Sequence, residues 1–193
     1  MPSHLSNFGL NLTSFSISAL YSKVSALKEK GIKVLLALGG WNDSLGSKYS
    51  TLVSSAGSRA RFVTQALEFV TKYRFDGLDL DWEYPKCWQV DCSKGPDSDK
   101  ENFASLVKEL SAAFKPKSLL LSAAVSPSKM VIDAGYDVPV LSQYLDWISV
   151  MTYDYHGHWD KMTGHVAPFK VHENATNVYF NAVRWLLLAY LTS

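Results

Sequence analysis

The chain has 193 residues, of which 47% are hydrophobic and 13% aromatic, and its formal charge is +1. This composition is that of a globular domain with one substantial core, and its near-neutral charge gives no reason to expect nucleic acid or an anionic membrane as a partner. No apolar run approaches the ~18–20 residues that span a bilayer, and residues 1–20 lack the basic start and apolar core of a signal peptide.

The hydrophobic pattern predicts helices and strands in alternation. Residues 1–18 have no clear period, Gly31 is expected to end the first helix, and Asp99 is expected to cap the third. The expected helices cover residues 18–30, 56–73, 99–114 and 138–144, and the expected strands cover residues 32–38, 75–84, 118–125 and 147–153. Apolar strands separated by helices indicate a parallel α/β sheet, either in a barrel or in an open doubly wound sheet. No glycine-rich nucleotide loop follows a strand, which weakens the nucleotide-binding version.

Within the expected strand 75–84, three carboxylates occupy alternate positions: Asp79, Asp81 and Glu83. Side chains alternate along a strand, so the three acids share one face about 6.5–7 Å apart, and the residues between them, with Tyr84, fall on the other. The acids could simply line the solvated face of an antiparallel edge. The apolar flanking strands favour a parallel sheet instead, in which polar residues near a strand's C-terminal end indicate a site. Beside Asp81, Glu83 would hold its proton longer and could act as a general acid.

Aromatic residues follow several strand ends. Trp41 comes after the glycine pair that ends the strand 32–38, Tyr84 follows the acids, and Tyr153, Asp154 and Trp159 follow the last strand. Each has an ordinary alternative: aromatic rings are often plain core, and an aspartate often caps a helix. Sugars, however, present flat apolar faces that stack on aromatic rings. Aromatic rings beside paired carboxylates therefore suggest a carbohydrate cleft, since two carboxylates are the usual equipment of a glycosidase.

Two cysteines, Cys87 and Cys92, lie five positions apart in the polar loop 85–98. They favour a small loop disulfide over two free thiols, and no further ligands are spaced for zinc. The three strand acids could bind a hard cation, but only Asp154 stands at a matching strand end. We therefore expect no metal site. The histidines at 156, 158 and 165 are interpreted as loop residues, and sequons begin at Asn11 and Asn174.

Three motifs resemble glycoside hydrolase family 18, most closely an arthropod-type chitinase. Residues 76–85 (DGLDLDWEYP) match the family's DxxDxDxE signature, residues 38–41 (LGGW) resemble its strand-3 motif, and residues 151–157 (MTYDYHG) resemble its strand-6 motif. The resemblance runs from about residue 21 to residue 180. It implies a (β/α)8 barrel, an extracellular hydrolase of chitin or chito-oligosaccharides, and no cofactor.

The resemblance also implies substrate-assisted retention, in which the N-acetyl oxygen of the substrate replaces an enzyme nucleophile. In that scheme Glu83 protonates the glycosidic oxygen, Asp81 orients the acetamide, and Asp79 tunes Asp81. Tyr153 donates a hydrogen bond to the acetamide carbonyl. Further sugar contacts are implied for Asp154 and Met151 in the pocket and for Trp41, Tyr84 and Trp159 as stacking platforms.

The chain departs from the family in length, because a complete barrel takes about 250 residues. Aligned to the family, it carries strands 3 to 6, so we expect an incomplete TIM barrel: a single partial catalytic domain over residues 1–193, with atypical ends at 1–20 and 183–193. It is expected to be a piece of a full enzyme, with two open sheet edges that make it poorly soluble or dependent on a partner. The alternative function is a catalytically silent chitin-binding or lectin-like protein, although such proteins typically lose the terminal acid, which is present here as Glu83.

Overall fold

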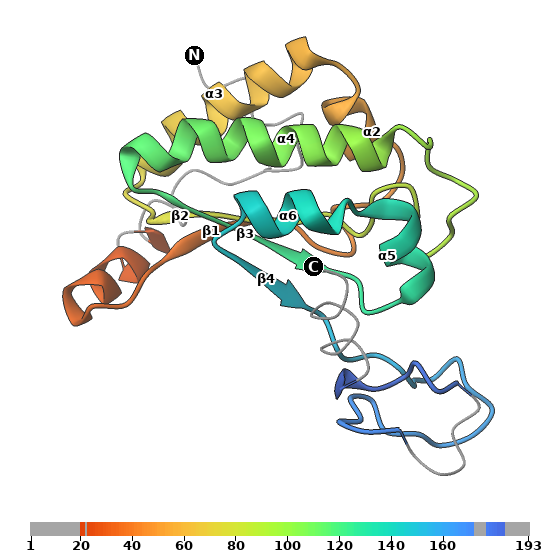
Figure 1. Ribbon diagram of the computed structural model, residues 1–193. Coiled ribbons are helices and arrows are strands. Elements are labelled where there is room, and N and C mark those ends of the chain that lie inside the picture. The colour runs from red at the N-terminus through yellow and green to blue at the C-terminus, as the bar shows by residue number, and fades with distance from the viewer. Residues whose placement is uncertain (1–19, 22, 172–176, 184–193) are drawn as a thin grey trace.

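The computed structural model describes residues 20–21, 23–171 and 177–183. Its centre is a four-stranded sheet in the order β1-β2-β3-β4, and every pair of neighbours is parallel (Figure 1). The strands are β1 (Leu35–Gly39), β2 (Gly77–Asp81), β3 (Leu120–Val125) and β4 (Trp147–Val150). The atypical ends expected at 1–20 and 183–193 lie almost entirely outside the described residues, as do the sequon asparagines Asn11 and Asn174.

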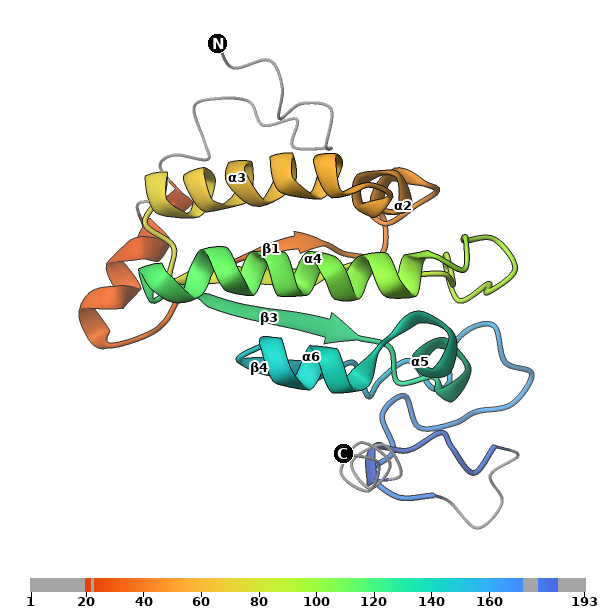
Figure 2. The ribbon, with the colours of Figure 1, turned by 45° about the horizontal axis from the view of Figure 1, so that its top comes forward.

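The helices cover one face of this sheet, as Figures 1 and 2 show. They are α2 (Lys48–Val53), α3 (Ala56–Lys72), α4 (Asp99–Phe114), α5 (Lys129–Gly135) and α6 (Val138–Tyr144), with short 3-10 helices η2 (Ala26–Lys30) and η3 (Lys115–Lys117). A doubly wound sheet would carry helices on both faces and a reversal of strand order. Strands in chain order with helices on one face are the wall of a TIM barrel, so the expectation of an incomplete barrel is confirmed.

Local sequence explains the two long helices. The Ser55 hydroxyl accepts a hydrogen bond from the Ser58 amide at 3.1 Å, and the Ser58 hydroxyl accepts one from the Ser55 amide, which together form a capping box at the start of α3. In α4, apolar residues recur every three or four positions and form a buried stripe: Phe103, Leu106, Val107, Leu110 and Phe114. This stripe packs onto the sheet and fixes the outer layer.

The Asp76 carboxylate ties neighbouring strands together at the end of the sheet opposite the site. The Asp76 carboxylate accepts the Val34 amide at 2.9 Å and pairs with Lys28 at 3.1 Å. Burial raises the pKa of Asp76, but the Val34 amide and the Lys28 ammonium outweigh it and hold that pKa below its usual value. The first acid of the sequence signature is therefore a structural clamp between β1 and β2.

The register gives the two faces of the sheet different chemistry. On the helix side, Leu38 lies beside Leu80, which lies beside Ala123. On the other side, Ala37 lies beside Asp79, which lies beside Ser122. The apolar residues between the acids thus face the helices, and the acids face the open side, as strand alternation predicts.

Several predicted boundaries were wrong in detail. The strand expected over residues 75–84 ends at Asp81, and the strand expected over residues 147–153 ends at Val150. Asp99 does not cap α4: Ser98 is the N-cap, and Asp99 is the first helical residue, fully buried. The helix over 138–144 is confirmed, whereas α2 and α5 were not predicted. Among the described residues, no helix is both long and apolar enough to cross a bilayer.

Candidate active site

The acids of β2 stand where the strand ends. The Asp79 carboxylate accepts the Ser122 hydroxyl from β3 at 2.5 Å. Asp81, the last residue of β2, lies beside Gly39, the last residue of β1, and its carbonyl accepts the amide of the next residue, Gly40, at 2.7 Å. Gly39 has φ +124°, and a Cβ there would collide with that same carbonyl. The double glycine therefore permits the close approach of β1 to the acid strand.

Glu83 lies two residues beyond the strand and is held there by its backbone. Its amide donates to the Ser44 hydroxyl at 2.9 Å, and that hydroxyl in turn donates to the Asp81 carbonyl at 3.4 Å. The Glu83–Tyr84 peptide bond is cis. Only 9% of the Glu83 surface is exposed. Ser44, in the loop after β1, thus links the backbones on which two of the three acids are carried.

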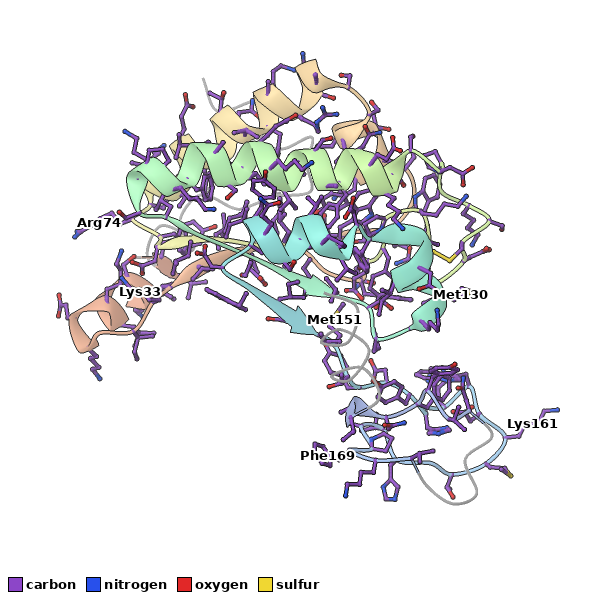
Figure 3. The ribbon with its side chains drawn as sticks, viewed as in Figure 1. Lys33, Arg74, Met130, Met151, Lys161 and Phe169 are labelled. Atoms are coloured by element: carbon purple, nitrogen blue, oxygen red, sulfur yellow. A yellow bond between two sulfur atoms is a disulfide. The ribbon has the colours of Figure 1, made fainter. Side chains whose placement is uncertain are left out.

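Glu83 lines a cavity of about 830 Å³ between the strand ends and the segment that follows β4. The cavity brings together seven of the nine predicted catalytic and sugar-binding residues: Trp41, Glu83, Tyr84, Met151, Tyr153, Asp154 and Trp159. Asp79 and Asp81 are not in its lining, because they lie deeper along β2. Figure 3 shows Lys33 and Arg74, which precede β1 and β2, at the other end of the sheet from Met130, which lines the cavity. The cavity is therefore at the carboxyl end of the strands.

Burial and neighbouring charge both favour protonated acids here. Burial, then the charge of Asp81 and, to a smaller extent, that of Asp154, raise the pKa of Glu83 above its usual value, while a hydrogen bond from Tyr84 opposes the rise. Burial and the charge of Asp79 raise the pKa of Asp81. Asp81 and Glu83 therefore each hold a proton to a higher pH than a solvent-exposed carboxyl group would.

Two tyrosines beside the acids remain neutral hydroxyl donors. Burial and the nearby carboxylates raise the pKa of Tyr153, and burial and Glu83 raise the pKa of Tyr84. Asp154 adopts a left-handed backbone conformation, with φ +56°, and does not begin a helix in the described structure. Of the alternatives considered, the helix-capping aspartate is therefore wrong, and half-exposed Tyr153 is no core residue.

Tyr84 corrects one detail of the strand pattern. Alternation placed it on the face opposite the acids, but the strand ends before it and Tyr84 lines the same cavity as Glu83. Trp82 does follow the pattern: its ring packs against Tyr49 and Phe103 with centroids 5.7 Å away in each case. The alternation of side chains thus holds up to Trp82 and Glu83 and fails at Tyr84.

Cys87 and Cys92 form the expected disulfide, with an S–S distance of 2.00 Å. Within the part of the chain that the structure describes, no three His, Cys, Asp or Glu side chains converge in a way that could hold a metal ion. Sequence reasoning missed Ser44, Ser122 and the α5 residues of the cavity wall, Lys129 and Met130. Of these, only Ser122 had a usable signal, since it is a polar residue inside an otherwise apolar strand.

Comparison with known proteins agrees with this geometry. The family profile described as glycosyl hydrolases family 18 matches residues 6–190. A probable chitinase 10 of Drosophila melanogaster is 63% identical over 161 residues, which are 83% of this chain and 7% of that protein. A probable chitinase 2 of the same organism is 49% identical over 150 residues, 77% of this chain and 30% of that protein.

The chain also resembles a solved structure in both fold and sequence. It is a mutant of catalytic domain 2 of a group II chitinase from Ostrinia furnacalis, in complex with penta-N-acetylchitooctaose (NAG)5. It superposes with a TM-score of 0.88 at 60% identity, over 90% of this chain and 45% of that one. The chain therefore spans less than half the length of each of these relatives.

Proposed function

The chain belongs to glycosyl hydrolases family 18, and from this membership we propose that its cavity binds chito-oligosaccharides and hydrolyses their β-1,4 linkages. One observation carries the proposal: Glu83, an acid with a raised pKa, lines a cavity walled by aromatic rings at the strand ends. A carboxyl group that stays protonated can donate to a leaving oxygen. The relative crystallised with an N-acetylglucosamine oligomer is consistent with that substrate class.

The proposed reaction is substrate-assisted and retains the anomeric configuration. Glu83 donates its proton to the glycosidic oxygen. At the same time, the acetamide oxygen of the sugar whose glycosidic bond is cleaved attacks the anomeric carbon of that sugar. The bond to the leaving sugar breaks, and the cyclic intermediate is opened by water that Glu83, now ionised, deprotonates. No group of the protein is covalently modified.

The remaining acids act through their charges. Asp81 accepts a hydrogen bond from the acetamide nitrogen, which orients the acetamide and stabilises the positive charge that develops on it. Asp79, which accepts a hydrogen bond from the Ser122 hydroxyl at 2.5 Å, lies behind Asp81 and raises the pKa of Asp81. Tyr153 donates to the acetamide carbonyl, and its raised pKa keeps the hydroxyl protonated at neutral pH.

The other cavity residues bind sugar without taking part in proton transfer. Met151 and Asp154 line the part of the pocket next to Tyr153, and Trp41, Tyr84 and Trp159 offer rings to the apolar faces of sugar units. Trp41 and Trp159 are about half exposed, so each ring has surface on which a sugar can stack. The proposed location is extracellular, and the Cys87–Cys92 disulfide supports an oxidising compartment.

The test compares the chain with its Glu83→Gln variant on a fluorogenic chito-oligosaccharide. We expect turnover by the unmodified chain and a loss of about 10²–10⁴-fold in kcat for the variant, with the dissociation constant for the oligosaccharide little changed. Turnover that survives the substitution removes Glu83 as the acid. Activity that is unaffected by EDTA excludes a metal-dependent hydrolase.

A second candidate is sugar binding without cleavage. The open face of the sheet favours it, because the Ala37 side chain beside Asp79 is exposed there and Asp79 and Asp81 are themselves partly exposed, so water can reach the acids from that side. Binding of the oligosaccharide by the unmodified chain with no turnover would decide for this candidate.

A further inference from the structure

The Gln89 side chain connects two segments of the cavity rim, the one after β1 that carries Trp41 and the one after β2 that carries Glu83. Its side-chain amide donates to the carbonyl of Trp41 at 3.1 Å and, more weakly, to the carbonyl of Glu83 at 3.5 Å. Trp41 follows β1 and Glu83 follows β2. One side chain therefore spans the rim of the cavity between residues 42 positions apart in the chain.

The loop that carries Gln89 has a backbone conformation that is unfavourable for its residues. Gln89 and Val90 both have left-handed backbones, with φ +49° and +69°, and a β-branched residue is rare in that region. Such a conformation persists only where its surroundings impose it. Here the Cys87–Cys92 disulfide and the pairing of Trp88 with Asp91 close the loop.

The base of the same loop is anchored in the core. The Trp88 indole donates to the Ser50 hydroxyl at 3.0 Å, and that hydroxyl donates to the Asp99 carboxylate at 2.6 Å. The same carboxylate oxygen accepts the Lys86 amide at 3.0 Å, and Asp99 has no exposed surface. The loop is thus fixed to α2 and α4 at its base and reaches Trp41 and Glu83 at its tip.

We propose that Gln89 is a positioning residue that fixes Trp41 relative to Glu83, so that a sugar chain long enough to stack on Trp41 presents its linkage to the acid. The proposal rests on the proposed function for its substrate. Val90, next in the loop, lines the cavity itself. The loop therefore forms part of the cavity wall and also carries the Gln89 side chain that connects Trp41 to Glu83. Sugars too short to reach Trp41 do not depend on Gln89, and the loop selects for longer chains.

The first test needs no activity. Gln89→Glu keeps the size of the side chain but removes the amide donor, and hydrogen exchange measures the effect on the whole chain of 193 residues. Losing one hydrogen bond should raise the exchange rates of amides in residues 40–46 about 2- to 10-fold and leave those of α4 unchanged. Lys94→Ala, on the same loop and in an ion pair with Asp91 at 3.6 Å, should change neither. Unchanged exchange in residues 40–46, or an equal rise throughout the chain, overturns the proposal.

The second test separates substrates by length. For a pentasaccharide of β-1,4-linked N-acetylglucosamine, Gln89→Glu should raise KM about 2- to 10-fold with kcat unchanged, and KM for the disaccharide should not move. In a Trp41→Ala background the same substitution should have no further effect. Equal losses for both sugars, or additive losses in the double variant, contradict the proposal. If the unmodified chain binds neither sugar, the proposed function fails and hydrogen exchange alone decides the role of Gln89.

Discussion

The two faces of the sheet are built from different side chains and serve different ends. On the helix-covered face, Leu78 and Leu121 are 1% exposed, and their strands, β2 and β3, contact α3 and α4. On the open face, the same strands carry Asp79 and Ser122, and Ala37 beside them is exposed. Grouping carboxylates costs free energy, so a strand that does so must be held by its other face. Side chains that stabilise the fold and side chains that form the site therefore alternate along each strand, one on each face of the sheet.

The largest test of this separation removes a side chain from the covered layer. Phe114 ends α4 and has no exposed surface, so Phe114→Ala should lower the free energy of unfolding by about 3–5 kcal/mol, as measured by urea denaturation. Trp147, on the open face of β4, is 43% exposed. Trp147→Ala is the matched control and should cost less than about 1 kcal/mol. Similar losses in both variants would show that the open face is also a core.

A smaller effect is expected within the open face itself. Ser122 is fully buried there and donates to the Asp79 carboxylate, so Ser122→Ala leaves a carboxylate oxygen without its donor. That loss should cost about 1–3 kcal/mol in the free energy of unfolding. Ser149, on the same face of β4 but exposed, is the control, and Ser149→Ala should stay within about 0.5 kcal/mol. If the two substitutions are equal, the hydrogen bond to Asp79 does not matter for folding.

The edges of the sheet give a third comparison. Within the described residues, β1 and β4 each have a neighbouring strand on one side only, and unpaired edges invite association between copies. We expect the chain to self-associate in sedimentation equilibrium. A charge on the open face of β1, Ala37→Lys, should weaken that association about tenfold. A monomer at all concentrations that unfolds cooperatively would contradict the expectation that the chain is poorly soluble or requires a partner.

The covered face could be predicted from the sequence more fully than the open one. Burial on that face depends on local periodicity, so the four strands and the helix over residues 99–114 were found. The ends of β2 and β4 were not found. After Asp81 the chain leaves the sheet and carries Glu83 and Tyr84 into the cavity together. No periodicity records where a strand stops.

The parts of the site that were missed depend on contacts between residues distant in sequence. The helices α2 and α5 have six and seven residues, fewer than two full turns, so their periodic signal is weak, although α6, which is as short as α5, was predicted. Asp99 looked like a cap because aspartate favours that position, but its partners Ser50 and Lys86 lie on other elements. Gln89 offered no signal at all, since its partners are backbone carbonyls.

The smallest expected effect concerns the charge on the acid. The pKa of Glu83 is raised in the folded chain above its ordinary value of 4.5 by burial and by Asp81. The folded state therefore binds more protons than the unfolded state at a pH between the two pKa values, and the contribution of Glu83 to stability falls as pH rises through that window. Gln carries no charge, so Glu83→Gln should be the more stable protein at pH 7, by about 1–3 °C in Tm, and the difference should vanish below about pH 4.

The control for this last comparison is Glu68→Gln, an exposed glutamate in the middle of α3, which should leave Tm unchanged at both pH values. A Glu83→Gln variant that is less stable than the unmodified chain at pH 7 would mean that hydrogen-bond donors fully satisfy the ionised carboxylate. Grouping the acids on the open face would then not destabilise the fold, and packing of the helix-covered face would have no such loss of free energy to offset. The alternation of apolar and acidic residues along β2 would need a different explanation.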